Sequence, residues 1–314
     1  MCEDHDRSNS DATFGDVKGP RAMATPSRPT IERAVATIAP RYGGAPVILM
    51  SGAPDDQLLP LSRQRHRLDD VLRELGPDEW AMPSRCAGWS IKDVAAHLVS
   101  VNRFWTASVW AGLAGSPTSF LANFDPVATP EQIVAGMRAL SPGDVMEQFT
   151  SSNEELLELL GGLTEEDWAV IAEAPPGHLP IRLLAAHALW DAWVHERDVG
   201  LPLGCEQPVQ VDEVAASLRY VCALTSAIAI LTGRGVAGTF EVDGQGPESM
   251  RFVLDVADAV VVHDAAPLAS GPVLRGDAVA LIEALSTRIP FPTTPPAGWV
   301  PLIEGLATAF DMHR

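Results

Sequence analysis

Apolar residues recur every three or four positions along several stretches of the first two thirds of the chain. This spacing places the apolar side chains on one face of an α-helix. It predicts long helices over residues 59–75, 90–105, 144–160 and 180–200, with a shorter helix starting near residue 129. Glycine pairs or Gly-Pro close several of them, as at Gly76-Pro77 and Gly161-Gly162. We therefore expect four principal helices around one core.

The pattern changes after residue 204. Residues 211–231 predict one more helix, but three segments rich in β-branched residues, 239–242, 250–256 and 259–263, predict strands separated by turns. Residues 277–287 return to a helical pattern. The sequence thus predicts a helical bundle over residues 57–204 and a small α+β domain over residues 205–314. Residues 1–56 are rich in Ser, Pro and Gly without a sustained period, and we expect a disordered N-terminal extension.

Composition narrows the classes of partner. The 314 residues carry a formal net charge of −19, and 46% of them are hydrophobic. Nucleic acids and anionic membranes reward clustered Lys and Arg, so neither is expected as a partner. No signal peptide opens the chain, and the longest apolar run, 220–231, is too short to span a bilayer. A cytoplasmic protein is expected. The pattern makes no prediction about oligomeric state.

The four cysteines are scattered along the chain, at Cys2, Cys86, Cys205 and Cys222. None of them forms a C-x-x-C pair, so the sequence supports neither a zinc ribbon nor a thioredoxin-type site. We expect reduced thiols.

The best candidate for chemistry lies in the predicted helix 180–200, which contains Asp191 and His195. Residues four apart on a helix lie on one face, about 6 Å apart along the axis, so the two side chains can converge on one metal ion. Catalytic zinc sites take three protein ligands and leave one position open. A third ligand must therefore come from another helix.

His97 is the best third ligand. Ser90 and Asp93 resemble a capping box at the start of its helix. Val94, Val101 and Phe104 then share a face with His97, which places the imidazole toward the core. The competing interpretation is a hydrogen-bonded core histidine, which is the commoner role of an isolated inward-facing His.

Together these residues resemble a known family. The segment Cys86-Ala-Gly-Trp-Ser, followed by Asp93 and His97, and the carboxylate four residues before His195 are similar to the mycothiol-dependent maleylpyruvate isomerase family, a branch of the DinB-like metal-binding four-helix bundles. The resemblance implies a divalent metal, usually zinc, bound by His97, Asp191 and His195. Asp191 departs from the family pattern, which has Glu. Because Asp is one methylene shorter, the helices must approach more closely or the carboxylate must bind through water.

The resemblance also implies a C-terminal domain similar to sterol-carrier proteins. In that domain the Arg that closes the last helix helps to bind an anionic substrate, which makes Arg288 the candidate catalytic residue. The alternative is an arginine that only favours the helix dipole and the solvent.

The function that follows is a reaction between a low-molecular-weight thiol and a small-molecule electrophile. A bound divalent metal lowers the pKa of a thiol, as it lowers that of water. By resemblance the thiol is mycothiol, and the reaction is an isomerisation or an S-transfer. Two alternatives stay open. One is a non-catalytic protein that binds metal and an apolar ligand. The other is metal-assisted hydrolysis, for which Glu196 and Asp198 are the local candidate bases.

Overall fold

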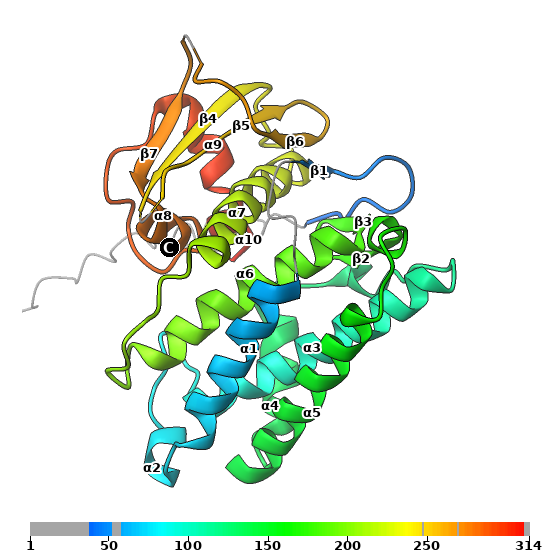
Figure 1. Ribbon diagram of the computed structural model, residues 1–314, viewed down its shortest axis with the longest axis vertical. Helices are drawn as coiled ribbons and strands as arrows, with labels where there is room; N and C mark the ends of the chain where they lie inside the picture. The colour runs from blue at the N-terminus through cyan, green and yellow to red at the C-terminus, as the bar shows by residue number, and fades with distance from the viewer. Residues whose placement is uncertain (1–37, 52–57, 247, 269, 311–314) are drawn as a thin grey trace, which may run out of the picture. The chain divides into compact units, whose positions relative to one another are not determined.

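The computed structural model describes residues 38–51, 58–246, 248–268 and 270–310. Most of the predicted N-terminal extension, residues 1–37 and 52–56, lies outside the described residues. The described residues belong to one compact unit, a helical bundle followed by an α+β region, as the sequence predicts (Figure 1).

Four long helices form the bundle, and the prediction of four principal helices is confirmed. They are α1 (Leu58–Arg73), α3 (Ile91–Leu113), α5 (Pro142–Gly161) and α6 (Ile181–Gly200). Two shorter helices, α2 (Pro77–Trp80) and α4 (Ala128–Met137), lie between them in the chain. α3 runs eight residues beyond the predicted end at 105, because its apolar pattern continues through Val109 to Leu113.

Capping residues fix where α3 begins. The Ser90 hydroxyl accepts a hydrogen bond from the Asp93 N–H at 3.2 Å, and the Asp93 carboxylate accepts one from the Ser90 N–H at 3.0 Å. This reciprocal pair satisfies two backbone donors that the first helical turn leaves free. Ser141 and Asp144 cap α5 in the same way. The caps set the axial position of the side chains that follow, including that of His97.

An antiparallel hairpin, absent from the sequence prediction, precedes α6. Its strands are β2 (Ile171–Ala174) and β3 (Gly177–Pro180). Glu173 in β2 is fully buried, and its carboxylate accepts hydrogen bonds from the N–H groups of Phe120 and Leu121 at 2.9 and 2.7 Å. The hairpin thereby anchors the short 3-10 helix η1 (Phe120–Asn123). A second 3-10 turn, η2 (Asp167–Ala169), comes just before β2.

The C-terminal region contains a five-stranded mixed sheet in the order β1-β6-β5-β4-β7. The predicted strands are confirmed as β4 (Gly238–Gln245), β5 (Met250–Val256) and β6 (Val260–His263), and β7 (Val273–Asp277) is additional. β1 (Ile48–Met50) pairs in parallel with β6. The prediction of a disordered extension is therefore wrong for residues 38–51. Val47 and Ile48 are fully buried, and this burial stabilises the short strand.

Helix α7 (Val211–Leu231) contacts both α6 and the sheet (Figure 1). Among the described residues it is the one helix long and apolar enough to cross a membrane, but 83% of its most apolar stretch is buried inside the protein. Such burial is typical of a core helix. One hydrophobic cluster includes Leu184 of α6, Tyr220 of α7 and Leu254 of β5, so the core continues across the predicted domain boundary at residues 204 and 205. That boundary stays a prediction.

The chain ends with short helices. They are α8 (Ala278–Leu285), η3 (Ala297–Trp299), α9 (Val300–Ile303) and α10 (Gly305–Ala309). The side chain of Asp277 caps α8 by accepting a hydrogen bond from the Ala280 N–H at 2.9 Å. The predicted helix 277–287 is confirmed as α8, which ends two residues earlier.

We expect Gly112→Ala to destabilise the protein. Gly112 is buried where α3 packs against β2, and a Cβ there would lie 2.6 Å from the Ile171 carbonyl oxygen and 3.2 Å from Ala172 Cβ. Because neither backbone can move without disturbing the packing, the free energy of unfolding should fall by about 2 kcal/mol. Denaturant unfolding followed by circular dichroism measures the change.

Gly136→Ala is the matched control. Gly136 lies inside α4, and no atom stands within 4 Å of the position of an added Cβ. There alanine should raise stability by about 0.5 kcal/mol or more, through helix propensity alone. A Gly112→Ala variant as stable as the wild type would contradict the close packing of α3 on β2.

Candidate functional site

The three predicted metal ligands converge. His97 comes from α3, and Asp191 and His195 come from successive turns of α6. One ligand atom from each lies within 4.8 Å of the others. The His97 and His195 rings are 4.9 Å apart between centroids, and His195 Nε2 is 3.5 Å from Asp191 Oδ1. Two helices far apart in sequence thus bring the three side chains to one point.

The arrangement fits a divalent cation. Two ligand atoms of a tetrahedral zinc ion, each about 2.0–2.1 Å from the metal, are separated by about 3.4 Å. The His195–Asp191 separation of 3.5 Å already has that value. Asp191 Oδ2 is buried and lacks a hydrogen-bond partner among the described residues. A buried carboxylate oxygen without a partner is destabilising unless a cation or donor meets it.

The orientation of His195 also favours a cation. Its Nδ1 lies 3.1 Å from Asp198 Oδ2, at a distance suited to an N–H that donates to the carboxylate. With the proton on Nδ1, the lone pair is on Nε2, which is the nitrogen that faces Asp191. A carboxylate that fixes the far nitrogen of a ligating imidazole is a common feature of metal centres. Asp198 therefore orients His195 with Nε2 toward Asp191, where a bound metal ion would take the place of the Nε2 proton.

The charges around the three side chains act on one another. Burial, with His195 nearby, lowers the pKa of His97 to about 4, so His97 is neutral near pH 7. Burial raises the pKa of Asp191, but His195 and His97 outweigh it and hold the pKa below its usual value. Burial lowers the pKa of His195, whereas Asp191, followed by Cys86 and Asp198, raises it to about 10. Asp191 thus attracts positive charge to the point where the ligand atoms meet.

Arg288 lies beside this centre, on the far side of Asp198. Its Nε donates to both Asp198 oxygens at 2.9 and 3.0 Å, and its Nη2 donates to Oδ2 at 2.8 Å. The Asp198 side chain is fully buried. Burial by itself raises the pKa of Asp198, but His195 and Arg288 hold it well below its usual range. Arg288 is therefore connected to the predicted metal ligand His195 through the carboxylate of Asp198.

A strained turn directs Arg288 toward the bundle. Helix α8 ends in a Schellman motif, in which the Arg288 N–H donates to the Glu283 carbonyl at 2.8 Å and the Thr287 N–H donates to the Ala284 carbonyl at 3.1 Å. The motif needs a left-handed residue, and Thr287 supplies it with φ of 63°. This conformation is uncommon for a β-branched residue.

Sequence reasoning missed the roles of Cys86 and Asp198. The Cys86 thiol donates to Asp198 Oδ2 at 3.2 Å and lies 3.7 Å from His195 Nδ1. Cys86, His195 and Asp198 thus form a second group of close ligand atoms. Arg288 already neutralises Asp198. We therefore interpret Cys86 and Asp198 as residues that position His195, and not as ligands of a second metal ion. For Asp198, the spacing of three residues from His195 on one helix was a usable signal.

Glu283 on α8 makes a second connection between the C-terminal region and the bundle. Its carboxylate accepts hydrogen bonds from Arg85 Nη1 at 2.9 Å and from Arg197 Nε at 2.7 Å. Together with the Arg288–Asp198 pair, these contacts place the end of α8 against the predicted metal ligands.

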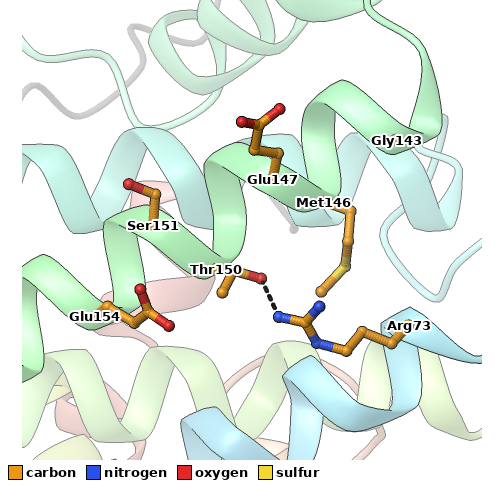
Figure 2. A pocket seen from close by; sticks show the side chains of 7 residues that line it. All are labelled: Arg73, Gly143, Met146, Glu147, Thr150, Ser151 and Glu154. Carbon is orange, nitrogen blue, oxygen red and sulfur yellow. Dashed lines mark hydrogen bonds between the residues drawn. The ribbon is translucent and has the colours of Figure 1, made fainter.

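A surface hollow lies between α1 and α5 (Figure 2). It is lined by Arg73, Gly143, Met146, Glu147, Thr150, Ser151 and Glu154. Arg73 Nη2 donates to Thr150 Oγ1 at 2.8 Å across it. None of the predicted site residues lines this hollow, so it is separate from the candidate metal centre.

Known proteins resemble this chain in sequence and in fold. Residues 61–200 match the family model described as Mycothiol maleylpyruvate isomerase N-terminal domain. This segment contains His97, Asp191 and His195, and the predicted resemblance to this family is confirmed over these residues.

Two crystal structures, of the mycothiol-dependent maleylpyruvate isomerase and of a mutant of it, match with TM-scores of 0.53 and 0.54. Each is 16% identical in sequence, and the match covers 78% of this chain and 97% of the other. At this identity the likeness shows the fold alone.

Two uncharacterized proteins of Mycobacterium tuberculosis, from strains CDC 1551 / Oshkosh and ATCC 25618 / H37Rv, are 28% identical to this chain over 143 residues. The match covers 45% of this chain and 54% of each of them. The chain therefore spans about half the length of the curated relatives it matches.

We expect Thr287→Gly to stabilise the protein. A left-handed conformation costs a residue with a side chain about 1–2 kcal/mol, whereas glycine adopts it freely. After the greater entropy of glycine in the unfolded chain is subtracted, the free energy of unfolding should rise by about 0.5–1 kcal/mol. Thermal unfolding measures it.

Thr232→Gly is the control, because Thr232 ends α7 with φ of −97° and its hydroxyl donates to the Ile228 carbonyl. That variant should lose stability. A loss of stability in Thr287→Gly as well would mean that Thr287 is not strained.

Proposed function

We propose that this chain, whose residues 61–200 form a domain of the mycothiol-dependent maleylpyruvate isomerase family, is a metal-dependent enzyme that joins a low-molecular-weight thiol to a small electrophile. The thiol is mycothiol by family, and the metal is a divalent ion, with zinc the first choice for two imidazoles and one carboxylate. The reaction is an isomerisation or an S-transfer.

The observation that carries the proposal is the convergence of His97, Asp191 and His195, with Asp198 holding the far nitrogen of His195. Three ligands supplied by the protein leave a tetrahedral ion one open position, as catalytic sites require. A purely structural zinc site has four protein ligands. The residue set therefore favours an ion that meets a substrate or cosubstrate.

The chemistry needs a thiolate near neutral pH. A divalent ion in this site would supply it by lowering the pKa of the thiol. The thiolate sulfur would then add to one carbon of an activated double bond, and the π electrons would move onto the activating group as a stabilised carbanion. If this adduct rotates about the resulting single bond and the carbanion expels the same thiolate, the net reaction is a geometric isomerisation. If the carbon–sulfur bond persists and the carbanion takes up a proton, the net reaction is an S-transfer.

The residues of the chain set the geometry for that step. Asp198 orients the His195 ring so that Nε2 faces Asp191. Arg288 neutralises Asp198 and lies 3.7 Å from the Cys86 sulfur. The Trp89 ring lies against the His97 ring, with centroids 5.3 Å apart, and adds an apolar wall next to the ligands. Such a wall limits the water that competes with the thiol.

Metal-assisted hydrolysis is less well supported, because both local candidate bases already hold cations. Glu196 accepts hydrogen bonds from Arg67 Nε at 2.5 Å and Arg67 Nη2 at 2.7 Å. Asp198 accepts from Arg288 and Cys86. Neither carboxylate is free to take a proton from water. The non-catalytic binding protein remains the second candidate, since the C-terminal sheet and α7 enclose a largely apolar core.

We expect Asp191→Ala to lose the metal and Asp191→Glu to keep it or bind it more tightly. Removing the carboxylate deletes one of three ligands, whereas Glu restores the longer side chain of the family pattern. Metal content by elemental mass spectrometry after metal-replete expression measures occupancy. Asp191→Ala should also unfold at lower temperature if the metal contributes to the folded state.

His66→Ala is the matched control, because His66 is an exposed histidine on α1. Its metal content should equal that of the wild type. Equal metal binding by the wild type, Asp191→Ala and Asp191→Glu would remove Asp191 from the coordination sphere.

We further expect a low-molecular-weight thiol to bind only the metal-loaded protein, and to bind more tightly as pH rises toward the lowered thiol pKa, because the thiolate is the ligand. In a Co(II)-substituted sample, coordination of sulfur adds a thiolate-to-metal absorption band. Titration with mycothiol or a simpler analogue should produce the band in the wild type and in His66→Ala, but not in His195→Ala.

Absence of the band with any thiol, together with saturable binding of a fatty-acid-like ligand, would favour the binding protein. Binding of the thiol without turnover of maleylpyruvate would favour S-transfer over isomerisation.

A further inference from the structure

Buried polar atoms without hydrogen-bond partners gather in the bundle core next to the candidate metal centre. Among the described residues they include Arg65 Nε on α1, Asn102 Oδ1 and Trp105 Nε1 on α3, and Asn153 Nδ2 on α5. All four residues are at most 4% exposed. Each unsatisfied buried polar atom costs about 1–3 kcal/mol, so the cluster calls for a polar occupant.

Hydrogen bonds connect Arg65, Asn102 and Asn153, and Trp105 follows Asn102 by three residues on α3. Asn102 Nδ2 donates to Asn153 Oδ1 at 2.7 Å, and Arg65 Nη1 donates to the same oxygen at 3.4 Å. Arg65 Nη2 donates to the Ala188 carbonyl at 3.4 Å. Ala188 lies about one helical turn before Asp191 on α6. The cluster therefore adjoins the metal ligands on their bundle side.

Arg65 differs from the buried Arg219 and from the partly buried Arg288. Within the described part of the chain it has no ion pair, whereas Arg219 pairs with Asp264 and Arg288 pairs with Asp198. Burial lowers the pKa of Arg65 to about 10, and the charge of Asp191 offsets part of that effect. The guanidinium is still protonated near neutral pH. A buried cation without a contacting counter-ion is strongly destabilising, which makes an anion the favoured occupant.

Three of these four unpartnered atoms are donors. Arg65 Nε and Trp105 Nε1 can only donate, and Asn153 presents its amide nitrogen. Exchanging the two ends of an Asn amide would move a donor to another position but would leave the Arg65 and Trp105 donors unchanged. A carboxylate matches this set, because it carries one negative charge and its two oxygens accept several hydrogen bonds.

We propose that Arg65, Asn102, Trp105 and Asn153 form a carboxylate-binding subsite beside the metal centre, which takes the acid group of a small organic molecule. This subsite deepens the proposed function, on which its role in turnover rests, because it would place an acidic electrophile next to the thiol. Its occupancy can be measured without turnover and without metal.

The test compares acetate with acetamide, a neutral molecule of nearly the same shape. Thermal unfolding is measured at matched ionic strength, for the protein as purified and again after chelation of metal. Acetate at millimolar concentration should raise the Tm of the wild type in both states, and acetamide should not, because mass action stabilises the form that binds. Quenching of tryptophan emission, to which Trp105 contributes, gives the affinities.

Arg65→Met keeps the length of the side chain and removes the charge and the donors. It should bind acetate at least tenfold more weakly. Arg73→Met on the same helix is the matched control, since Arg73 is half exposed and lies by the separate hollow of Figure 2. It should bind acetate as the wild type does. If Arg65→Met does not fold, the comparison of acetate with acetamide on the wild type still tests the proposal.

Three results would overturn the proposal. The first is no effect of acetate on the wild type, which would mean that only water fills the cluster. The second is an equal effect of acetamide on the Tm. The third is unchanged acetate binding in Arg65→Met. Failure of the thiol titration with Co(II) would instead count against the proposed function. Because the acetate measurement after chelation needs neither thiol nor metal, the two failures are distinguishable.

Discussion

The geometry of the centre depends on one buried carboxylate, that of Asp198. It accepts from His195 on its own helix and from Arg288, which follows α8 in the C-terminal region. A buried carboxylate is stable only when cations and donors surround it, and removing one partner leaves an uncompensated charge. The orientation of His195 in the bundle is therefore coupled to the position of α8. The α+β region thus takes part in shaping the site, and the hydrophobic core also runs continuously between the two regions.

The other charged side chains near the site are likewise paired with opposite charges. Arg85 and Arg197 share Glu283, and Arg288 is held by Asp198. The resemblance predicts Arg288 as a direct contact for an anionic substrate, but its guanidinium already faces a carboxylate. An anion that approached Arg288 would compete with Asp198. Arg65 feels the charge of Asp191 but has no carboxylate in contact among the described residues, so the cation best able to accept an anion lies within the bundle rather than at the end of α8.

The sequence predicts the parts of this molecule that leave a local pattern. The long helices follow from apolar spacing and caps, and Asp191 and His195 follow from a spacing of four. His97 was singled out by its inward position on a capped helix, although nothing local shows that α3 packs beside α6. β1 and the β2–β3 hairpin were missed since three or four residues are too few to show a period. The contacts of Asp198 with Cys86 and Arg288, and the isolation of Arg65, depend on residues far apart in the chain, which no window of sequence contains.

The replacement of Glu by Asp191 can be judged from the positions of the donor atoms. Three atoms within 4.8 Å of one another can all be reached from a point at most about 2.8 Å from each, whereas zinc requires about 2.0–2.2 Å. The difference is under about 1 Å per ligand, which is within the range of side-chain rotation. The shorter carboxylate therefore does not require the helices to move or a water to intervene. Asp191 Oδ2 is buried and has no hydrogen-bond partner among the described residues. A cation would satisfy that oxygen, which favours rotation of the three side chains toward a common ion.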